Sequence, residues 1–303
     1  MKAIVCTKYG SPEVLQLQKL QKPVPRNNEV LIKVRATTVS SGDCRIRSFQ
    51  SPLLYWIPMR IALGLRKPRK PILGTELSGE VIAVGSDVQR FQVGDQIFAF
   101  TGMGLGAHAE YICLPEDGLL ATKPTNATFE EAASVLFGGT AALYFLRKAK
   151  IQRGQKVLIF GASGSVGTSG VQLAKYFGAE VIGVCSTANV EMVKALGADH
   201  IVDYTKEDFT KSQERYDVIF DAVGKSEKVA CKKVMKAKGT YVTVEGSGMA
   251  RVRLEDVLTL KQLIESGQFK AVIDRCYSLE QMREAHTYVE KGHKKGNVVI
   301  TVK

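Results

Sequence analysis

A glycine-rich stretch in the middle of the chain has the residue types and spacing of a dinucleotide-binding turn. Glycines suit such a turn because side chains would keep a diphosphate away from backbone N–H groups, and the helix that follows adds unpaired donors and a positive dipole end. A buried-strand pattern precedes the stretch and a helical pattern follows it, so we predict a dinucleotide site. A glycine turn in another kind of α/β protein is the alternative. The stretch reads Gly161-Ala162-Ser163-Gly164-Ser165-Val166-Gly167.

The elements around this turn alternate between strand and helix patterns. This alternation predicts an α/β unit with a parallel sheet. Before it, 129–148 is helical in composition, with Thr128 or Asn126 as the N-cap and an interruption at the Gly138–Gly139 pair. The strands are expected at 157–160, 180–185, 200–204, 218–222 and 239–244, with helices at 166–177 and 189–196.

The first third of the chain is β-rich. Runs such as 30–36, 79–85 and 93–100 have strand character, and Pro, Gly, Asn and Asp separate them often. Short strands with frequent turns predict a partly open barrel.

Composition restricts the class of protein. The chain has 303 residues, 45% of them hydrophobic, and a formal net charge of +12. Basic residues are scattered, except for one cluster at 66–70, so we interpret them as solvated surface and expect no nucleic-acid partner. The six cysteines form no CxxC pair and are expected to be buried hydrophobes. No apolar run could span a bilayer, and the N-terminus has no signal-peptide pattern, so we expect a cytoplasmic protein without a membrane partner.

Several blocks together resemble one family. The segment 154–167, with Gln172 and Lys175 behind it, is similar to the signature of the zinc-independent, zeta-crystallin-like quinone oxidoreductases of the medium-chain dehydrogenase/reductase superfamily. Ser165 stands where that signature has a second consecutive glycine. Further matches cover nearly the whole chain: Gly74-Thr75-Glu76-Leu77-Ser78-Gly79, Val93-Gly94-Asp95, Leu196-Gly197-Ala198-Asp199, Asp203-Tyr204 and 292–299.

This resemblance implies a fold and a domain order. We expect a GroES-like, partly open β-barrel catalytic domain at 1–122, a Rossmann domain with a doubly wound parallel sheet at 123–268, and a return to the catalytic domain at 269–303. The resemblance also implies an active site in the cleft between the domains.

The motifs disfavour zinc. Zinc relatives of the superfamily carry a histidine where this chain has Thr75, and Ser stands where a ligand cysteine is expected, with Cys44 out of register. Zinc needs at least three strong ligands, and a threonine hydroxyl is a poor one. We therefore predict no metal; a constellation of Cys44, Glu76 and His108 is the competing arrangement.

The end of the second Rossmann strand favours NADPH, with NADH as the alternative. It carries no acid to bond a ribose 2′-hydroxyl. Ser186, Thr187 and Asn189 could donate hydrogen bonds to a 2′-phosphate. By resemblance, Tyr204 lies beside the same phosphate, and Lys294 or Lys295 could supply positive charge. Lys295 is our prediction of the two.

Without zinc, the carbonyl oxygen of the substrate needs hydrogen-bond donors. Ser40 lies where relatives carry Asn, and Tyr55 and Thr75 are further candidates, each with a structural interpretation as a turn or strand-end residue. By resemblance Thr140 lies near the nicotinamide, and Asp43 is expected to cap a turn. The apolar segment 53–59 is either a substrate-pocket loop or a core helix.

These observations predict NADPH-dependent hydride transfer to a small electrophile, a quinone or an α,β-unsaturated carbonyl. The alternatives are a zinc alcohol dehydrogenase and a non-catalytic NADPH sensor. The sequence also departs from the family after the fifth strand, where 245–250 leads directly to a helix signal at 254. Because that edge joins two subunits in many relatives, we expect dimerisation to be altered or lost.

Overall fold

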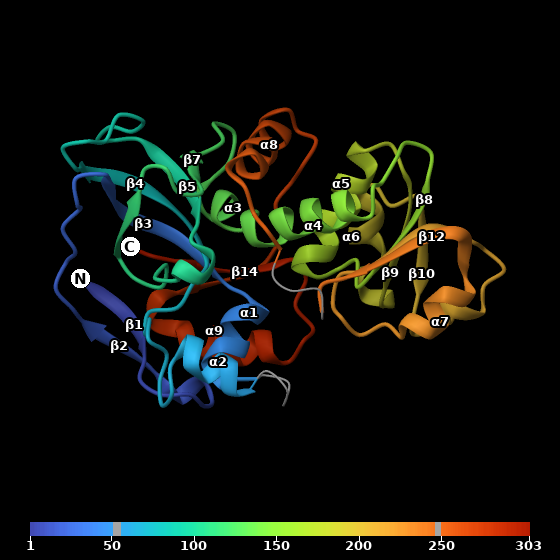
Figure 1. Ribbon diagram of the computed structural model, residues 1–303, viewed down its shortest axis with the longest axis horizontal. Helices are drawn as coiled ribbons and strands as arrows, with labels where there is room; N and C mark the ends of the chain where they lie inside the picture. Colours follow the sequence, from blue (N-terminus) through green and yellow to red (C-terminus); the bar gives the residue numbers. More distant parts are fainter. Residues whose placement is uncertain (51–55, 246–249) are drawn as a thin grey trace. The chain divides into compact units, whose positions relative to one another are not determined.

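The computed structural model describes residues 1–50, 56–245 and 250–303. The chain divides into two compact units (Figure 1). The first unit contains Met1–Leu136 and Ile273–Lys303, and the second contains Phe137–Val272. The first unit is therefore built from both ends of the chain. It also includes the segment 123–136, which we expected in the Rossmann domain.

The first unit is built on a large mixed sheet. Its strand order is β13-β14-β3-β4-β5-β7, with β6 paired to β3, and β1 and β2 form a separate antiparallel pair. All neighbours are antiparallel except β13 and β14. Since β13 and β7 are the two edges of this order, the described strands form no closed barrel. The strands are β1 (Lys2–Cys6), β2 (Leu15–Lys19), β3 (Glu29–Val39), β4 (Glu76–Val84), β5 (Gln96–Phe100), β6 (Tyr111–Pro115), β7 (Leu120–Thr122), β13 (Ile273–Ser278) and β14 (Asn297–Thr301).

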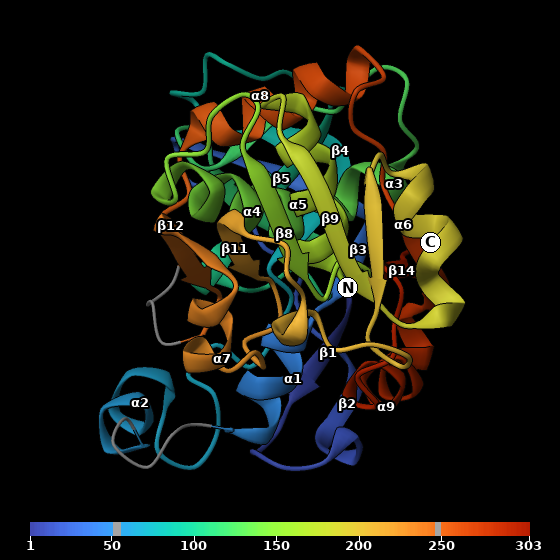
Figure 2. The same cartoon turned by 90° about the vertical axis from the view of Figure 1, so that its right-hand side faces the viewer.

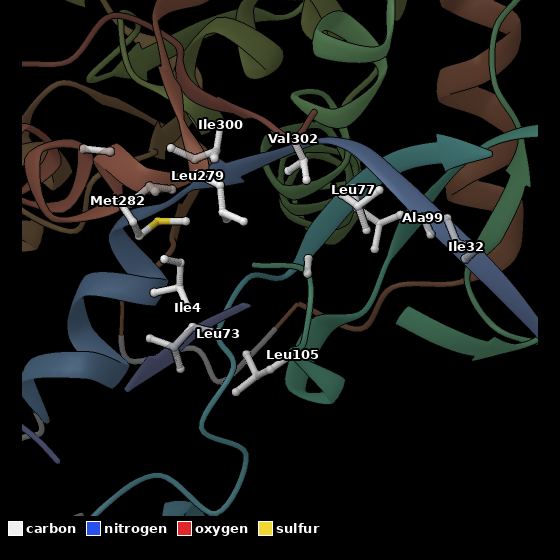
Figure 3. Close-up of a cluster of buried hydrophobic side chains, with 14 of the residues drawn as sticks. Ile4, Ile32, Leu73, Leu77, Ala99, Leu105, Leu279, Met282, Ile300 and Val302 are labelled. Carbon is white, nitrogen blue, oxygen red and sulfur yellow. The ribbon is translucent and has the colours of Figure 1, made fainter. Parts of the chain in front are cut away.

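The core of this unit joins side chains from both ends of the chain (Figure 3). Ile32, Leu77 and Ala99 come from three neighbouring strands, and all are fully buried. Leu279 and Met282 pack in the same cluster from the C-terminal segment. Each large apolar side chain removed from water contributes about 1.5–3 kcal/mol, so this shared core ties the C-terminal return to the first unit.

Short helices complete the first unit. Ser40 caps α1, and Thr128, one of the two candidates named from the sequence, caps α3 through a capping box with Glu131. Helix α3 packs on β3 and β4, which explains why the segment before it stays with the first unit. The helices are α1 (Ser41–Ser48), α2 (Trp56–Leu63), α3 (Phe129–Ala133) and α9 (Met282–Glu290).

The second unit is a parallel five-stranded sheet of order β10-β9-β8-β11-β12. Figure 2 shows β11, β8 and β9 side by side. Every neighbouring pair is parallel, so the predicted α/β fold is confirmed. The elements are α4 (Leu136–Lys148), which begins at the last residue of the first unit, β8 (Lys156–Phe160), α5 (Ser165–Tyr176), β9 (Glu180–Cys185), α6 (Val190–Ala195), β10 (His200–Asp203), β11 (Tyr216–Asp221), α7 (Lys228–Lys233), β12 (Met235–Thr243) and α8 (Leu254–Glu265).

The predicted helix interruption at Gly138 and Gly139 is wrong. The break falls earlier, at Ser134, and both glycines lie inside α4. They serve close packing, because a Cβ on Gly138 would lie 2.5 Å from the Ser165 carbonyl oxygen and one on Gly139 would lie 2.7 Å from Leu260. The missing side chains thus let α4 approach α5 and α8 despite the helix-propensity cost of about 1 kcal/mol per glycine.

The described residues between β12 and α8 contain no strand, in line with the shortened edge expected from the sequence. Across the described parts of the chain, no helix has the length and apolarity needed to cross a bilayer.

Candidate functional site

The glycine turn connects β8 to α5 in the second unit. Gly161 adopts a φ of +76°, which favours glycine, and a Cβ on Gly167 would lie 2.0 Å from the Gly161 carbonyl oxygen. Gly164 is the N-cap of α5, and the nearest atom to a Cβ there would be 3.7 Å away. The backbone is therefore tightly packed at Gly167, whereas there is free space beside Gly164.

The start of α5 offers hydrogen-bonding groups to a ligand. The first N–H groups of a helix have no partner within the helix. The hydroxyl of Ser165 is buried and has no hydrogen-bond partner among the described residues. A turn that has open space at Gly164, beside free backbone donors, fits a diphosphate. The residues of this turn that suit a dinucleotide are Gly161, Ala162, Ser163, Gly164, Ser165, Val166 and Gly167.

Two neighbouring features hold this turn. Asp221 ends β11, and its carboxylate accepts hydrogen bonds from the backbone N–H groups of Val223 (3.1 Å) and Gly224 (2.8 Å). Val223 in turn fills the space beside Gly161, where a Cβ would lie 2.6 Å from its Cγ1. Sequence reasoning missed Asp221; an acid at the end of a predicted parallel strand was the available signal.

Thr140, predicted near the nicotinamide, is buried on α4, two residues after Gly138.

The polar residues after β9 contact one another. The Asn189 side-chain amide donates to the Ser186 hydroxyl at 3.0 Å. The Thr187 hydroxyl donates to the Asp203 carboxylate, and it lies 3.0 Å from the Thr205 hydroxyl. Thr187 therefore directs its hydrogen at Asp203 rather than outward.

The end of β9 carries no acid, as the sequence indicated, but Asp203 on the neighbouring strand lies beside it. It ends β10, directly opposite Cys185 of β9. Hydrogen bonds from the hydroxyls of Thr187 and then Thr205 hold its pKa well below the usual range, so it is ionised at neutral pH. Lys206 lies 3.4 Å from it. Asp203 lies 18 residues after Cys185 in the sequence, and only the parallel pairing of β10 with β9 brings the two together.

Tyr204 follows Asp203 directly and is exposed, with 56% of its surface accessible. Lys295, the other outlying cofactor candidate, belongs to the first unit. Its side chain is exposed, and its backbone N–H donates to Asp274 at 2.9 Å. Lys294 is half-buried and donates to the Gly296 carbonyl. Burial lowers the Lys294 pKa to about 8, with Glu76 and Asp274 acting in the opposite direction.

In the first unit, Asp43 bonds Ser40, one of the predicted donors, and Gly74, the residue before Thr75. Its carboxylate accepts from the Ser40 hydroxyl (2.6 Å), the Ser40 N–H (2.8 Å) and the Gly74 N–H (3.0 Å). The predicted capping role of Asp43 agrees with this geometry. The Ser40 hydroxyl hydrogen is used within this network, so Ser40 positions Asp43 and Gly74 instead of offering a free donor.

Thr75 follows Gly74 and differs from Ser40. Its carbonyl accepts from the Thr101 N–H at 2.7 Å, which fixes its backbone, while its buried hydroxyl has no hydrogen-bond partner in the described parts of the chain. Nearby, the buried Glu76 carboxylate accepts from the Thr38 hydroxyl at 2.6 Å. Tyr55, the remaining catalytic candidate, lies outside the described residues. The structure thus leaves Thr75 as the predicted donor with an uncommitted hydroxyl.

Comparison with known proteins places this geometry in a family. Residues 26–124 match the alcohol dehydrogenase GroES-like domain, and 165–292 match the zinc-binding dehydrogenase domain. The chain is 35% identical to a 2-methylene-furan-3-one reductase of Solanum lycopersicum, with 99% of this chain and 79% of the relative covered. It is 32% identical to an NADPH-dependent alkenal/one oxidoreductase of Arabidopsis thaliana, over 99% and 79%. The structure of a quinone oxidoreductase from Coxiella burnetii superposes with a TM-score of 0.89 at 30% identity, covering 100% of this chain and 99% of that one.

The chain belongs to the zinc-independent quinone oxidoreductase branch of the medium-chain dehydrogenase/reductase superfamily. The resemblance described from the motifs is thereby confirmed, and so is the pairing of a GroES-like domain with a Rossmann-like sheet.

One matched domain of this family is described as zinc-binding, but the described residues do not provide a zinc site. Throughout residues 1–50, 56–245 and 250–303, no three His, Cys, Asp or Glu side chains cluster closely enough to hold a metal. The alternative constellation is also engaged elsewhere: Cys44 contacts His286, Glu76 accepts from Thr38, and His108 bonds the Thr38 carbonyl at 2.9 Å. This donor set does not fit zinc, which needs at least three converging ligands.

Cys44 belongs to a buried cluster that sequence reasoning did not find. The Arg47 guanidinium is fully buried, forms an ion pair with Glu290 and donates from Nε to His286 Nδ1 at 3.3 Å. Because Nδ1 accepts, His286 carries its proton on Nε2 and is neutral. Burial, then the charges of His108 and Arg47, holds the His286 pKa well below its usual value. Burial also raises the Cys44 pKa to about 12, so this thiol is unreactive at neutral pH.

Proposed function

We propose that this protein is an NADPH-dependent oxidoreductase that reduces quinones or α,β-unsaturated carbonyls. The observation that carries the proposal is the glycine cradle: Gly167 packs against the Gly161 carbonyl, and the unpaired Ser165 hydroxyl lies beside it. The names of the relatives agree with this chemistry, since they describe an NADPH-dependent alkenal/one oxidoreductase and quinone oxidoreductases.

The cradle would hold the diphosphate of the nicotinamide cofactor, which supplies the hydride when bound. The residues 161–167 provide backbone donors, and Thr140 lies on the adjoining helix α4. Ser186, Thr187, Asn189, Tyr204 and Lys295 remain our proposal for the 2′-phosphate, although Thr187 is already bonded to Asp203. We expect NADPH to bind more tightly than NADH, and comparing the two dissociation constants by calorimetry tests this preference.

Thr75 is our proposal for the group that stabilises the substrate. Charge develops on the carbonyl oxygen of a quinone or enone as hydride arrives, and a fixed hydroxyl donor stabilises that oxygen more in the transition state than in the ground state. The Thr75 hydroxyl is buried and uncommitted, and hydrogen bonds to its own carbonyl fix its backbone. Ser40 and Asp43 hold the preceding residue, Gly74, and thus act as positioning residues.

An NADPH-oxidation screen over quinones, enones, aldehydes and alcohols tests the reaction class. Activity on quinones or enones is the expected result, and it should survive treatment with a zinc chelator. Activity confined to alcohols and aldehydes and lost with chelation would support a zinc alcohol dehydrogenase instead. Tight NADPH binding without turnover on any substrate would support a sensor.

The edge of the parallel sheet supports a proposal on the oligomeric state. We infer that β12 does not form the subunit contact expected for the family, because the described residues after it continue to α8 without a further strand. Light scattering of the purified protein tests this inference, and a dimer that crosslinks through β12 would contradict it. A cytoplasmic location stays an expectation.

A further inference from the structure

Helix α2 carries its apolar side chains outward. Ile57 and Ile61 are four residues apart and thus lie on one face of the helix. They are 65% and 58% exposed, and Leu65 just beyond the helix is 70% exposed. Trp56 adds a further partly exposed ring, at 43%. This arrangement contradicts the core-helix interpretation for the described part of 53–59; residues 53–55 lie outside the described residues.

Arg60 of α2 instead packs its guanidinium against aromatic side chains of the first unit. The Arg60 guanidinium lies over the rings of Phe49 (4.0 Å), Tyr9 (4.6 Å) and Trp56 (4.9 Å), which are favourable cation–π distances. The Tyr9 hydroxyl donates to the Gly64 carbonyl at 2.9 Å. The side of α2 that carries Arg60 and the partly exposed Trp56 is therefore held against the first unit, while the side that carries Ile57 and Ile61 faces away. A surface helix of a soluble protein has the opposite polarity.

A basic segment follows the apolar face directly. Arg66, Lys67, Arg69 and Lys70 are all exposed, and none forms an ion pair with a carboxylate of the described residues. The sequence from 44 to 75 contains no Asp or Glu. Both Figure 1 and Figure 2 show α2 at the periphery of the first unit. We call Trp56, Ile57, Ile61 and Leu65 together with these four cations the α2 patch.

We propose that the α2 patch docks the protein on an anionic lipid surface, with the apolar side chains in the interfacial region and the cations at the headgroups. Exposed tryptophan and aliphatic side chains beside clustered Lys and Arg are the features of interfacial membrane binding. Such docking needs no membrane-spanning helix. It differs from our sequence-based expectation of no membrane partner, and it does not depend on the proposed reaction.

Charge and size argue against protein partners. A second copy of the chain would bring two sets of the four cations together, and like charges repel. Three apolar residues on a short helix and one just beyond it are also too few, because each side of a stable protein interface uses about 20–30 residues. A lipid surface, by contrast, accepts apolar side chains without a complementary groove.

Trp56 makes the test direct, because it is the single tryptophan of the chain. Emission of the whole protein is measured with phosphatidylcholine vesicles with and without phosphatidylserine, at low and at high salt. We expect a blue shift, and quenching by brominated lipid, only with phosphatidylserine at low salt. No shift with either vesicle would overturn the proposal.

Matched variants separate the patch from net charge. R66Q/K67Q/R69Q/K70Q should weaken partitioning by several hundred-fold, since each cation contributes about fivefold. I57S/I61S should weaken it by at least about tenfold per side chain. Two controls should retain binding. K225Q/K232Q/K233Q/K238Q removes the same charge from exposed lysines of the second unit. V24S/V229S removes exposed apolar side chains outside the α2 patch. Circular dichroism confirms that each variant folds.

Two further outcomes would contradict docking on lipid. Equal loss of binding in the two charge variants would show that net charge alone attracts the vesicles. A wild-type dimer that I57S/I61S converts to a monomer, with no vesicle binding, would show that the patch joins two copies.

Discussion

The backbone of Gly167 lies so close to Gly161 that a Cβ on Gly167 would be 2.0 Å from the Gly161 carbonyl oxygen. That contact fixes the start of α5 against the end of β8. At Gly164 the same turn has room, with 3.7 Å to the nearest atom. The two glycines therefore serve different purposes: Gly167 closes the turn on itself, and Gly164 leaves space for a ligand.

Alanine at these two positions should separate folding from cofactor binding. We expect G167A to lower the free energy of unfolding by about 1–3 kcal/mol and to weaken NADPH binding at the same time. G164A should leave stability nearly unchanged and still weaken binding, because only a bound diphosphate meets the added methyl group. Thermal unfolding and calorimetric titration measure both effects. Unchanged NADPH affinity in G164A would contradict the placement of the cofactor.

The Thr75 hydroxyl should matter for turnover and not for stability. Replacing an unpaired buried hydroxyl by a methyl group removes no hydrogen bond within the described structure. We expect T75V to keep its melting temperature and NADPH affinity while kcat falls by roughly 100-fold. By contrast, S40A removes a helix cap and should cost about 1 kcal/mol of stability. Wild-type kcat in T75V would remove Thr75 from the proposed mechanism.

Asp203 should weaken the preference for NADPH. Its carboxylate is ionised and bonded to Thr187, one of the residues proposed for the 2′-phosphate. We expect D203N to tighten NADPH binding on the order of two- to fivefold while NADH binding changes little, because a screened charge repulsion is relieved. K206Q, which removes the cation 3.4 Å from Asp203, should act in the opposite direction. Dissociation constants of both cofactors check this, and parallel changes for NADPH and NADH would contradict it.

The buried His286 should make the protein less stable in mild acid. Its pKa is lower in the folded state than in the unfolded chain, where it is about 6.5. Below that pH the unfolded chain binds a proton that the folded protein does not, so the free energy of unfolding falls by up to about 1.4 kcal/mol per pH unit. Above pH 7 His286 adds no pH dependence.

Urea unfolding between pH 5 and 7 measures this slope. H286Q should flatten it, whereas H293Q, at an exposed histidine, should leave it as in the wild type. Equal slopes in the wild type and H286Q would show that other groups cause the pH dependence.

The sequence predicted most of the Rossmann-like unit because its signals are local. The expected strand 180–185 coincides with β9, and the helix after the glycine turn begins within one residue of its predicted start. Periodicity and capping residues act over a few positions, so they can be read along the chain. The role of Gly138 and Gly139 cannot be predicted in this way, because they make room for Ser165 and Leu260, which are distant in sequence.

The sequence by itself determined the family, the parallel sheet, the glycine turn and the candidate donors. Only the tertiary structure decided which donors are uncommitted: it paired Ser40 with Asp43 and Thr187 with Asp203, and it left the Thr75 hydroxyl without a partner in the described residues. It also turned Arg60 inward and Ile57 outward on α2. The physical reason is that hydrogen bonding and burial depend on which segments meet in space, and residue type alone does not specify the partner.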